Sequence, residues 1–433
     1  MQRTIQTFSV ENIIEFKHNL LSWAQQFETV LWLDSNNDHQ KYSTFDGVLA
    51  ADDFTSIHTD YYNAFEKLKE YQSITKDYIF GYITYDVKND VEQLSSSNFD
   101  GLNFADLYFF QPKKLFFIKG NSIAFHYLKM VDDEIKDDFK EIRKFKSPTS
   151  QVPKSDLKIK LRIHKDEYHA KASRFLEHIK EGNIYEANFC QEFYAEDATI
   201  HPVEVYKHLN QISEPPFASF LKLEDKYALC ASPERYLKKE GLHIISQPIK
   251  GTAKRLVSEL DDAKLASDLM RNEKERAENV MIVDLVRNDL SKTAKKGSVK
   301  VEELCKVYSF KQVHQLISTV VSEIEETTHA VDVLKDSFPM GSMTGAPKIS
   351  AMKIIEDLEE TKRGLYSGTV GYFTPENDFD FNVIIRSILY NETKKYVSYS
   401  VGSAITAKSI VEKEYEECLL KAKAMKYVLL NSK

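Results

Sequence analysis

The chain has 433 residues, of which 42% are apolar, and it contains 23 Tyr and 26 Phe. This composition supports a sizeable hydrophobic core and excludes an intrinsically disordered chain. The net charge is −8 with no basic block, so we expect no nucleic-acid partner. No apolar signal core and no 18-residue apolar run is present, so we expect a cytoplasmic protein that does not enter a membrane. The cysteines Cys190, Cys230, Cys305 and Cys418 lack zinc-ligand spacing and are typical of free thiols in a reducing compartment.

Helical spacing of apolar residues predicts a first helix at 11–28, followed by a strand in "TVLWLDS". "DYIFGYITYDV" is typical of a strand, and "LFFIKGNSIAFHYL" predicts a hairpin that turns at "KGN". Residues 131–158 are charged and contain two prolines, so they are the best candidate for an internal linker.

Beyond this segment, strands come in runs and helices in separate blocks. We expect a helix at 164–182, a strand at 183–196, an antiparallel meander at 217–251, helices at 259–290, strands at 298–324 and 368–405 with a helix at 346–360 between them, and a closing helix at 409–430. This order predicts an α+β fold rather than strictly alternating βαβ units.

The stretch "SQPIKGTAKR" places Lys250 in a short apolar turn. Lys250 is either a surface lysine beside a tight turn or an amine held partly out of water, where it loses its proton more easily and can attack a substrate. Glu234, in "ASPERYL", would face Lys250 if the two residues lie on neighbouring antiparallel strands. That pair is either a structural ion pair or a general acid beside a nucleophile.

Two carboxylate pairs stand at i,i+3 spacing, Glu275 with Glu278 in "RNEKERAEN" and Glu414 with Glu417 in "EKEYEECLLKAK". Each pair lies on one face of a predicted helix. Such pairs are usually solvated helix faces, but two pairs that face each other would form an all-oxygen site suited to Mg²⁺. Lys421 follows Glu417 by one turn, near the same face.

"GSMTGAPK" superficially resembles a P-loop, but the lysine does not follow the second glycine directly. A glycine-rich turn before a helix can still direct backbone N–H groups at an anion. Arg386 interrupts the predicted apolar strand "FNVIIRSILY" as either a buried ion-pair partner or a clamp for a carboxylate. Gly402, in "SVGSAIT", would let backbone approach a ligand closely. His314 is either a satisfied core or surface residue or part of a site.

Taken together, these motifs resemble the chorismate-utilising enzymes, the family of anthranilate synthase component I, aminodeoxychorismate synthase component I, and the isochorismate and salicylate synthases. The matching segments are "GNIYEANFCQEF", "SPERYL", "PIKGTAKR", "EKERAENVMIVDLVRNDL", "FPMGSMTGAPKISAMKIIEDLE", "YSGTVGYF", "VIIRSILY" and "EKEYEECLLKAKAM". The resemblance covers residues 160–430, the expected chorismate-binding core, and is looser over residues 1–150. It implies a single large domain over 1–433, built from two packed, mainly antiparallel β-sheets flanked by helices.

The lysine in P-I-K-G-T resembles the aminodeoxychorismate branch, in which this lysine is a covalent nucleophile. The resemblance then implies amination of chorismate to 4-amino-4-deoxychorismate, for p-aminobenzoate and folate. Lys250 attacks the ring as the 4-hydroxyl departs, Glu234 protonates the leaving oxygen, and ammonia displaces Lys250. His314 matches the family histidine near the ring.

The resemblance also implies the ligands of a cation and of the substrate carboxylates. Mg²⁺ would be held chiefly by Glu278 and Glu417, with Glu275 and Glu414 close by. The substrate carboxylates would be held by Arg386, Tyr366, Lys421, Thr344 and the backbone around Gly251, Thr252 and Gly402. The chain shows no glutaminase motif, so ammonia is expected from a glutamine amidotransferase subunit or from solution.

Glu186, in "IYEANF", departs from the family pattern. It stands where the water-adding members have a lysine base and the ammonia-using members usually a glutamine, which argues against isochorismate synthase. A glutamate there could help to deprotonate ammonium. The alternatives are anthranilate synthase component I, which Lys250 disfavours, and a catalytically silent chorismate-binding subunit, which the complete set of site residues disfavours.

Overall fold

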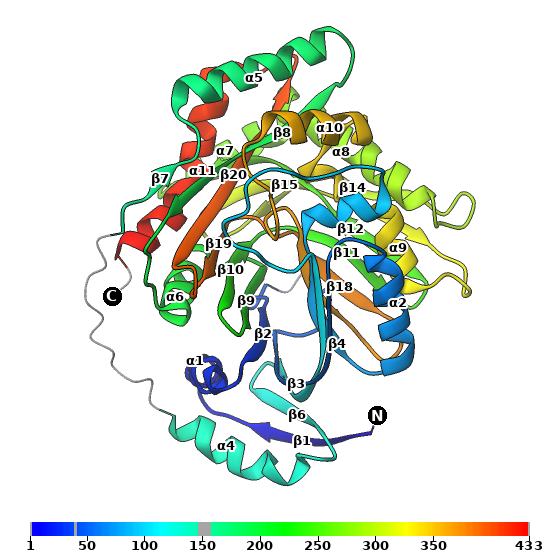
Figure 1. Cartoon of the computed structure of the whole chain (residues 1–433), viewed down its shortest axis with the longest axis vertical. Coiled ribbons are helices and arrows are strands. Elements are labelled where there is room, and N and C mark those ends of the chain that lie inside the picture. The colour runs from blue at the N-terminus through cyan, green and yellow to red at the C-terminus, as the bar shows by residue number, and fades with distance from the viewer. Residues whose placement is uncertain (1, 39–40, 146–156, 432–433) are drawn as a thin grey trace.

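The computed structural model describes residues 2–38, 41–145 and 157–431 (Figure 1). The described α-helices are α1 (Ile13–Trp23), α2 (Ala64–Thr75), α3 (Lys88–Val91), α4 (Ile135–Lys144), α5 (Lys165–Lys180), α6 (Pro202–Ser213), α7 (Glu259–Arg271), α8 (Glu273–Ser291), α9 (Ala330–Ser337), α10 (Lys348–Leu358) and α11 (Val411–Asn431). The described strands are β1 (Arg3–Ser9), β2 (Thr29–Asp34), β3 (Gly47–Thr59), β4 (Ile79–Ile83), β5 (Leu107–Lys119), β6 (Ser122–Leu128), β7 (Lys160–Leu161), β8 (Glu186–Ala195), β9 (Phe217–Leu223), β10 (Lys226–Ser232), β11 (Arg235–Glu240), β12 (His243–Gln247), β13 (Ile249–Lys254), β14 (Lys300–Ser309), β15 (Val313–Glu323), β16 (Gly345–Ala346), β17 (Thr369–Phe373), β18 (Phe379–Asn382), β19 (Ser387–Asn391) and β20 (Tyr396–Thr406).

The ladders between these strands are antiparallel, which confirms the α+β prediction. Two arms of the sheet meet at β5, which pairs with β3 along one edge and with β4 along the other. One arm continues from β3 through β2, β9, β10, β19 and β20 to β8. The other continues from β4 through β17, β18, β11 and β12 to β15, which also pairs with β13 and β14. The two expected sheets are therefore continuous with each other through β5.

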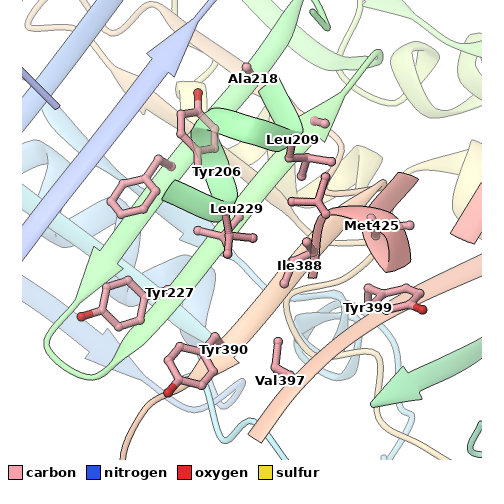
Figure 2. Packing of buried hydrophobic residues seen from close by; sticks show 14 of the residues in the cluster. Tyr206, Leu209, Ala218, Tyr227, Leu229, Ile388, Tyr390, Val397, Tyr399 and Met425 are labelled. Atoms are coloured by element: carbon pink, nitrogen blue, oxygen red, sulfur yellow. The ribbon is translucent and has the colours of Figure 1, made fainter. Parts of the chain in front are cut away.

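The two faces of the first arm bury different apolar clusters, because successive side chains of a strand point to opposite faces. Val30 and Trp32 of β2 belong to one cluster, and Leu31 between them belongs to the other. Figure 2 shows the first cluster where Leu209 of α6 and Met425 of α11 lie over the strand residues Leu229 and Ile388. Each such buried side chain contributes roughly 1.5–3 kcal/mol relative to an exposed one. This packing anchors α11 to the sheet.

Helices α5, α8 and α10 lie at one end of the molecule, and β1, β6 and α4 lie at the opposite end (Figure 1). Helix α8 packs on β13 and β15, and α11 packs on β20 and α6. Since β13 and β20 belong to different arms, the carboxylate-bearing helices approach each other from the two arms of the sheet.

The linker prediction for 131–158 is wrong in part, because α4 occupies residues 135–144. Its buried Ile135 and Ile142 are seven residues apart, and Phe139 packs between them against the first cluster. This i, i+4, i+7 spacing is helical, but the charged residues around it resemble a linker. Residues 146–156 of the predicted linker lie outside the described residues.

Strands from the N-terminal part pair directly with strands of the core, β2 with β9 and β4 with β17. The single-domain organisation with a looser part at 1–150 stays a prediction. Within the described ranges, the helices are all too short or too polar to cross a lipid bilayer.

Candidate active site

Lys250 lies on β13 and faces Glu186, the first residue of β8. The Nζ atom of Lys250 is 3.1 Å from Oε1 of Glu186, and the two side chains are 13% and 2% exposed. Burial acts to lower the pKa of Lys250, but the charges of Glu186, Glu278 and Glu417 outweigh it and raise this pKa. The expectation that the amine loses its proton more easily is therefore wrong. Neighbouring carboxylates hold Lys250 as an ammonium ion.

Glu234 lies between β10 and β11 and is 4% exposed. Burial raises the pKa of its carboxyl to about 7, although the Ser342 hydroxyl and the charge of Lys250 act in the opposite direction. Loss of hydration disfavours the charged form, and the nearby cation compensates only in part. A carboxyl with this pKa is protonated in a large fraction of molecules at neutral pH, so Glu234 can donate a proton.

Helices α8 and α11 bring the four predicted glutamates into one electrostatic cluster. Nζ of Lys274 is 3.7 Å from Glu278 and 3.5 Å from Glu414, so this lysine links the two helices. Burial raises the pKa of Glu275, and the charge of Glu417 raises it further. Burial also raises the pKa of Glu278, to about 7. These couplings bring the two pairs into one region, as the cation-site alternative requires, and their role as ligands stays a prediction.

The start of α8 is set by Asn272, whose side-chain oxygen accepts hydrogen bonds from the backbone N–H groups of Lys274 and Glu275. An asparagine at this position satisfies N–H groups that have no partner within the helix. The cap therefore positions Glu275 and Glu278 at the N-terminal end of α8.

The donor set of this cluster fits a hard divalent cation. Oε1 of Glu278 is buried and has no hydrogen-bond partner among the described residues. Mg²⁺ commonly binds one or two protein carboxylates and completes its shell with water and substrate oxygens. No three His, Cys, Asp or Glu side chains in the described ranges form a metal site by themselves. The cluster therefore fits a cation that shares its shell with water or substrate.

Arg386 does not lie within a strand, as the apolar pattern suggested, but at a bend before β19 with a φ of +52°. Its guanidinium forms no hydrogen bond or ion pair with the residues that the structure describes. Burial lowers the pKa of Arg386. The charges of Glu234, Glu417 and Tyr366 act in the opposite direction but do not outweigh burial. Arg386 is thus a partly buried cation whose N–H donors remain available for a carboxylate.

Gly402 and Tyr366 meet at Cys190. A Cβ added at Gly402 would lie 2.7 Å from Sγ of Cys190, and the Tyr366 hydroxyl is 3.9 Å from the same atom. The Gly402 carbonyl accepts a hydrogen bond of 2.9 Å from Lys421, which also lies 2.7 Å from Glu417. Lys421 therefore lies near the carboxylate face, as its spacing predicted.

Gly251 has a φ of +95°, and a Cβ there would lie 3.1 Å from Oε2 of Glu275. Lys250 and Gly251 thus lie in a strand, not in the predicted turn, and the backbone of β13 at Gly251 approaches the cluster as closely as only glycine permits. Thr252 follows it as an exposed residue. The hydroxyl of Thr344, by contrast, is buried and donates within its own turn, toward the carbonyls of Met340 and Gly341. That hydroxyl is not a free donor for a substrate.

His314 is a second predicted site residue that the contacts do not support. It is 2% exposed, with Nδ1 2.8 Å from the Ser309 hydroxyl and Nε2 2.9 Å from Asp262. Both ring nitrogens are occupied, so none is available for a ligand in this arrangement. The geometry favours the core-histidine interpretation, and the catalytic role of His314 stays a prediction.

The chain matches the family described as chorismate binding enzyme over residues 28–427. The chain belongs to this family. The Lys250, Glu234 and glutamate motifs all lie within the matched region.

Among curated members of the family, aminodeoxychorismate synthase component 1 of Bacillus subtilis is 36% identical over 264 residues, covering 61% of this chain and 56% of that protein. Anthranilate synthase component 1 of Thermus thermophilus is 33% identical over 354 residues, covering 80% of this chain and 76% of that protein. The chain thus matches little more than half of the first protein's length. Both branches are similar, so family membership leaves the specific reaction open.

Solved structures of the family share the fold. Anthranilate synthase component I of Streptococcus pneumoniae superposes with a TM-score of 0.78 at 24% identity, covering 90% of this chain and 94% of that chain. The menaquinone-specific isochorismate synthase of Escherichia coli gives a TM-score of 0.75 at 15% identity, covering 99% and 95%. These likenesses confirm the predicted fold.

Two residues at the chorismate-family site were not singled out by the motifs. Lys274 connects α8 with α11, and its i,i+4 spacing to Glu278 was the available signal. Ser342 is buried and lies beside Glu234, whose pKa its hydroxyl acts to lower. The amino-acid sequence carries no comparable signal for Ser342, because Ser342 and Glu234 are more than a hundred positions apart.

Proposed function

We propose that this chain aminates chorismate with ammonia to 4-amino-4-deoxychorismate. The observation that carries the proposal is a largely buried lysine, Lys250, close enough to the buried carboxyl of Glu234 to act on it by charge, with the pKa of that carboxyl at about 7. A nucleophile and a proton donor are the two groups needed to replace a hydroxyl through a covalent intermediate.

The reaction divides into two displacements. The Lys250 amine forms a C–N bond to the ring of chorismate while the C–O bond of the 4-hydroxyl breaks, and Glu234 donates a proton so that water leaves. Ammonia then forms the second C–N bond, and the bond to Lys250 breaks. The unpaired guanidinium of Arg386 and the ammonium of Lys421 would hold the substrate carboxylates.

The glutamates of α8 and α11 would hold Mg²⁺, with Glu278 and Glu417 as the chief ligands. When bound, the ion would neutralise carboxylate charge and orient a substrate carboxylate. Glu275 and Glu414 would complete the negative surroundings, and Lys274 would move from its position between the two helices.

We propose a glutamine amidotransferase subunit as the source of ammonia. The curated relatives named component 1 support a partner subunit, since that name marks one part of an assembly. The product would be a precursor of p-aminobenzoate and thus of folate. Ammonium salts at mildly alkaline pH would replace the partner in the test tube.

The test is product identification by mass spectrometry after the purified chain is incubated with chorismate, Mg²⁺ and an ammonium salt. We expect a product in which amino replaces hydroxyl and the enolpyruvyl group remains. Lys250→Ala should abolish this product. Lys254→Ala, an exposed lysine on the same strand, is the matched control and should leave turnover unchanged.

Two results would overturn the proposal. Anthranilate with pyruvate would assign the chain to the branch of the Thermus relative. Unchanged chorismate, even with an added glutaminase subunit, would identify a silent chorismate-binding subunit.

A further inference from the structure

Glu186 is held rigidly beside the proposed nucleophile. It is the first residue of β8, and its backbone pairs with Ala346 of β16 on one side and with Thr406 of β20 on the other. The residue is 1% exposed, so its carboxylate has little access to water. Its position next to Lys250 is therefore a fixed feature of the sheet.

The two oxygens of Glu186 have unequal surroundings. Oε1 lies 3.1 Å from Nζ of Lys250, and Oε2 is buried with no hydrogen-bond partner among the described residues. A carboxylate that accepted several hydrogen bonds would lose them on protonation and would be a weak base. Glu186 can accept a proton from Lys250 without losing any other described interaction.

The other carboxylates around Lys250 have different partners. Glu278 lies near Lys274, and Glu417 lies near Lys421. Glu275 and Glu234 influence Lys250 by charge but lie beyond ion-pair distance of its amine. Of the carboxylates on β8, α8, α11 and the β10–β11 turn that face Lys250, Glu186 alone forms an ion pair with it within the described ranges.

We propose that Glu186 is the catalytic base that takes a proton from Nζ of Lys250 before attack and returns it after Lys250 leaves the substrate. The proposal rests on the proposed function and adds a residue to it. It also explains why a site that holds Lys250 as an ammonium ion can use this residue as a nucleophile.

The proton count balances. Glu186 takes one proton from the Lys250 ammonium, and Glu234 gives one to the departing hydroxyl, which leaves as water. The neutral lysine released by ammonia recovers its proton from Glu186. The product amine is formed as an ammonium group, and one proton from solvent or from the incoming ammonium restores Glu234. The sum is chorismate and ammonium converted to the aminated product and water.

The first of two experiments needs no substrate. Lys250 is acetylated with dilute acetic anhydride at pH 8, and the rate is followed by peptide mass spectrometry. Removing the charge of Glu186 with Glu186→Gln should lower the pKa of Lys250, so labelling should accelerate about tenfold or more. Glu186→Asp keeps the negative charge, so Lys250 of this variant should be labelled slowly. Glu196→Gln removes a carboxylate from a Lys–Glu pair at the exposed far end of β8 and should change nothing.

The second experiment measures turnover by the wild type and the same three variants. If Glu186 is the base, Glu186→Gln should lower kcat by about 10²–10⁴-fold although its lysine is more reactive. Glu186→Asp should recover part of this loss, and Glu196→Gln should match the wild type. Faster labelling together with slower turnover is the signature of a base.

Other combinations overturn the proposal. If labelling and turnover both rise in Glu186→Gln, the carboxylate only restrains Lys250. If neither changes, the ion pair has no role. If the wild type forms no aminated product, the proposed function fails and the catalytic role of Glu186 fails with it. The labelling experiment then still shows whether Glu186 controls the proton of Lys250.

Discussion

At Lys250 and Glu234, burial and charge oppose each other, and a different effect prevails at each group. Burial disfavours the charged form of both side chains. For Glu234 this effect prevails and raises the pKa of the carboxyl to about 7. For Lys250 the surrounding carboxylates prevail, and the pKa of the amine rises. The two groups differ because the charges that act on Lys250 are carboxylates, which favour its proton, whereas those that act on Glu234 are the cations Lys250 and Arg386, which oppose the effect of burial only in part.

Glu234→Gln should reduce turnover and remove one source of pH dependence. A general acid must be protonated, so wild-type turnover should fall as the pH rises through about 7. Replacement by an amide should lower kcat by about 10²–10⁴-fold and eliminate this descending limb. A pH–rate profile of both enzymes is the measurement. Glu240→Gln, on the exposed end of β11, is the control, and an unchanged profile in Glu234→Gln would contradict the acid role.

The same substitution should stabilise the fold at alkaline pH. The pKa of the Glu234 carboxyl is raised from 4.5 to about 7 on folding, so the folded chain binds this proton more tightly. The tighter proton binding contributes about 3 kcal/mol to the free energy of unfolding. This contribution is complete below pH 4.5 and is lost as the pH rises through 7. Urea unfolding at pH 5 and pH 8 should therefore show a smaller loss in Glu234→Gln than in the wild type.

At the scale of the elements, the contact between β16 and β8 positions Glu186. Gly345 of β16 pairs with Ala187, and a Cβ on Gly345 would lie 2.2 Å from the Glu186 carbonyl oxygen and 2.9 Å from Cα of Ala187. Both are backbone atoms that cannot turn aside. Glycine is thus required for two strands and α10 to meet at this distance.

Gly345→Ala should push β8 away from β16 and displace Glu186. We expect a loss of about 1–3 kcal/mol in the free energy of unfolding, from overpacking, and a loss of turnover. Urea unfolding and steady-state kinetics are the measurements. Gly297→Ala is the control, because Gly297 has a φ of +77° and open space around it, so this change should strain a surface turn without affecting turnover. Full turnover in Gly345→Ala would show that this contact does not position the site.

At the scale of the whole molecule, the two arms of the sheet bring together helices that are far apart in the chain. Helix α8 packs on β13 and β15, and α11 packs on β20. The glutamates of both helices then share one region, where Lys274 is the described cation between them. Repulsion among these carboxylates is a cost of the folded state that a bound cation would relieve.

Mg²⁺ should therefore raise the melting temperature of the chain even without substrate. Binding to the folded state alone stabilises it by about 2.7 kcal/mol at a concentration one hundred times the Kd. Glu278→Gln should abolish this shift and should itself be more stable than the wild type in EDTA at pH 8, because the pKa of Glu278 is raised to about 7. Glu416→Gln, an exposed neighbour on α11, is the control for thermal scans with and without Mg²⁺. A shift that survives in Glu278→Gln would place the ion elsewhere.

Much of the fold was predictable, because periodicity is a local property. The apolar spacing of α1, the short apolar run of β2 and the turn between β5 and β6 all depend on neighbouring residues. Helix α4 was missed because charged side chains obscure three correctly spaced apolar residues. Arg386 was placed in a strand because its apolar neighbours suggested continuity, whereas its positive φ breaks the strand.

The amino-acid sequence by itself determined the family, the α+β class and which residue types reach the site. The identity and order of the motifs around Lys250, Glu234 and the two glutamate pairs carry that information. Only the tertiary structure decided that Lys250 is held as an ammonium ion, that Glu186 is its partner and that both nitrogens of His314 are occupied. Charge state and hydrogen bonding depend on distances between residues remote in the chain, and those distances exist only after the two arms have packed.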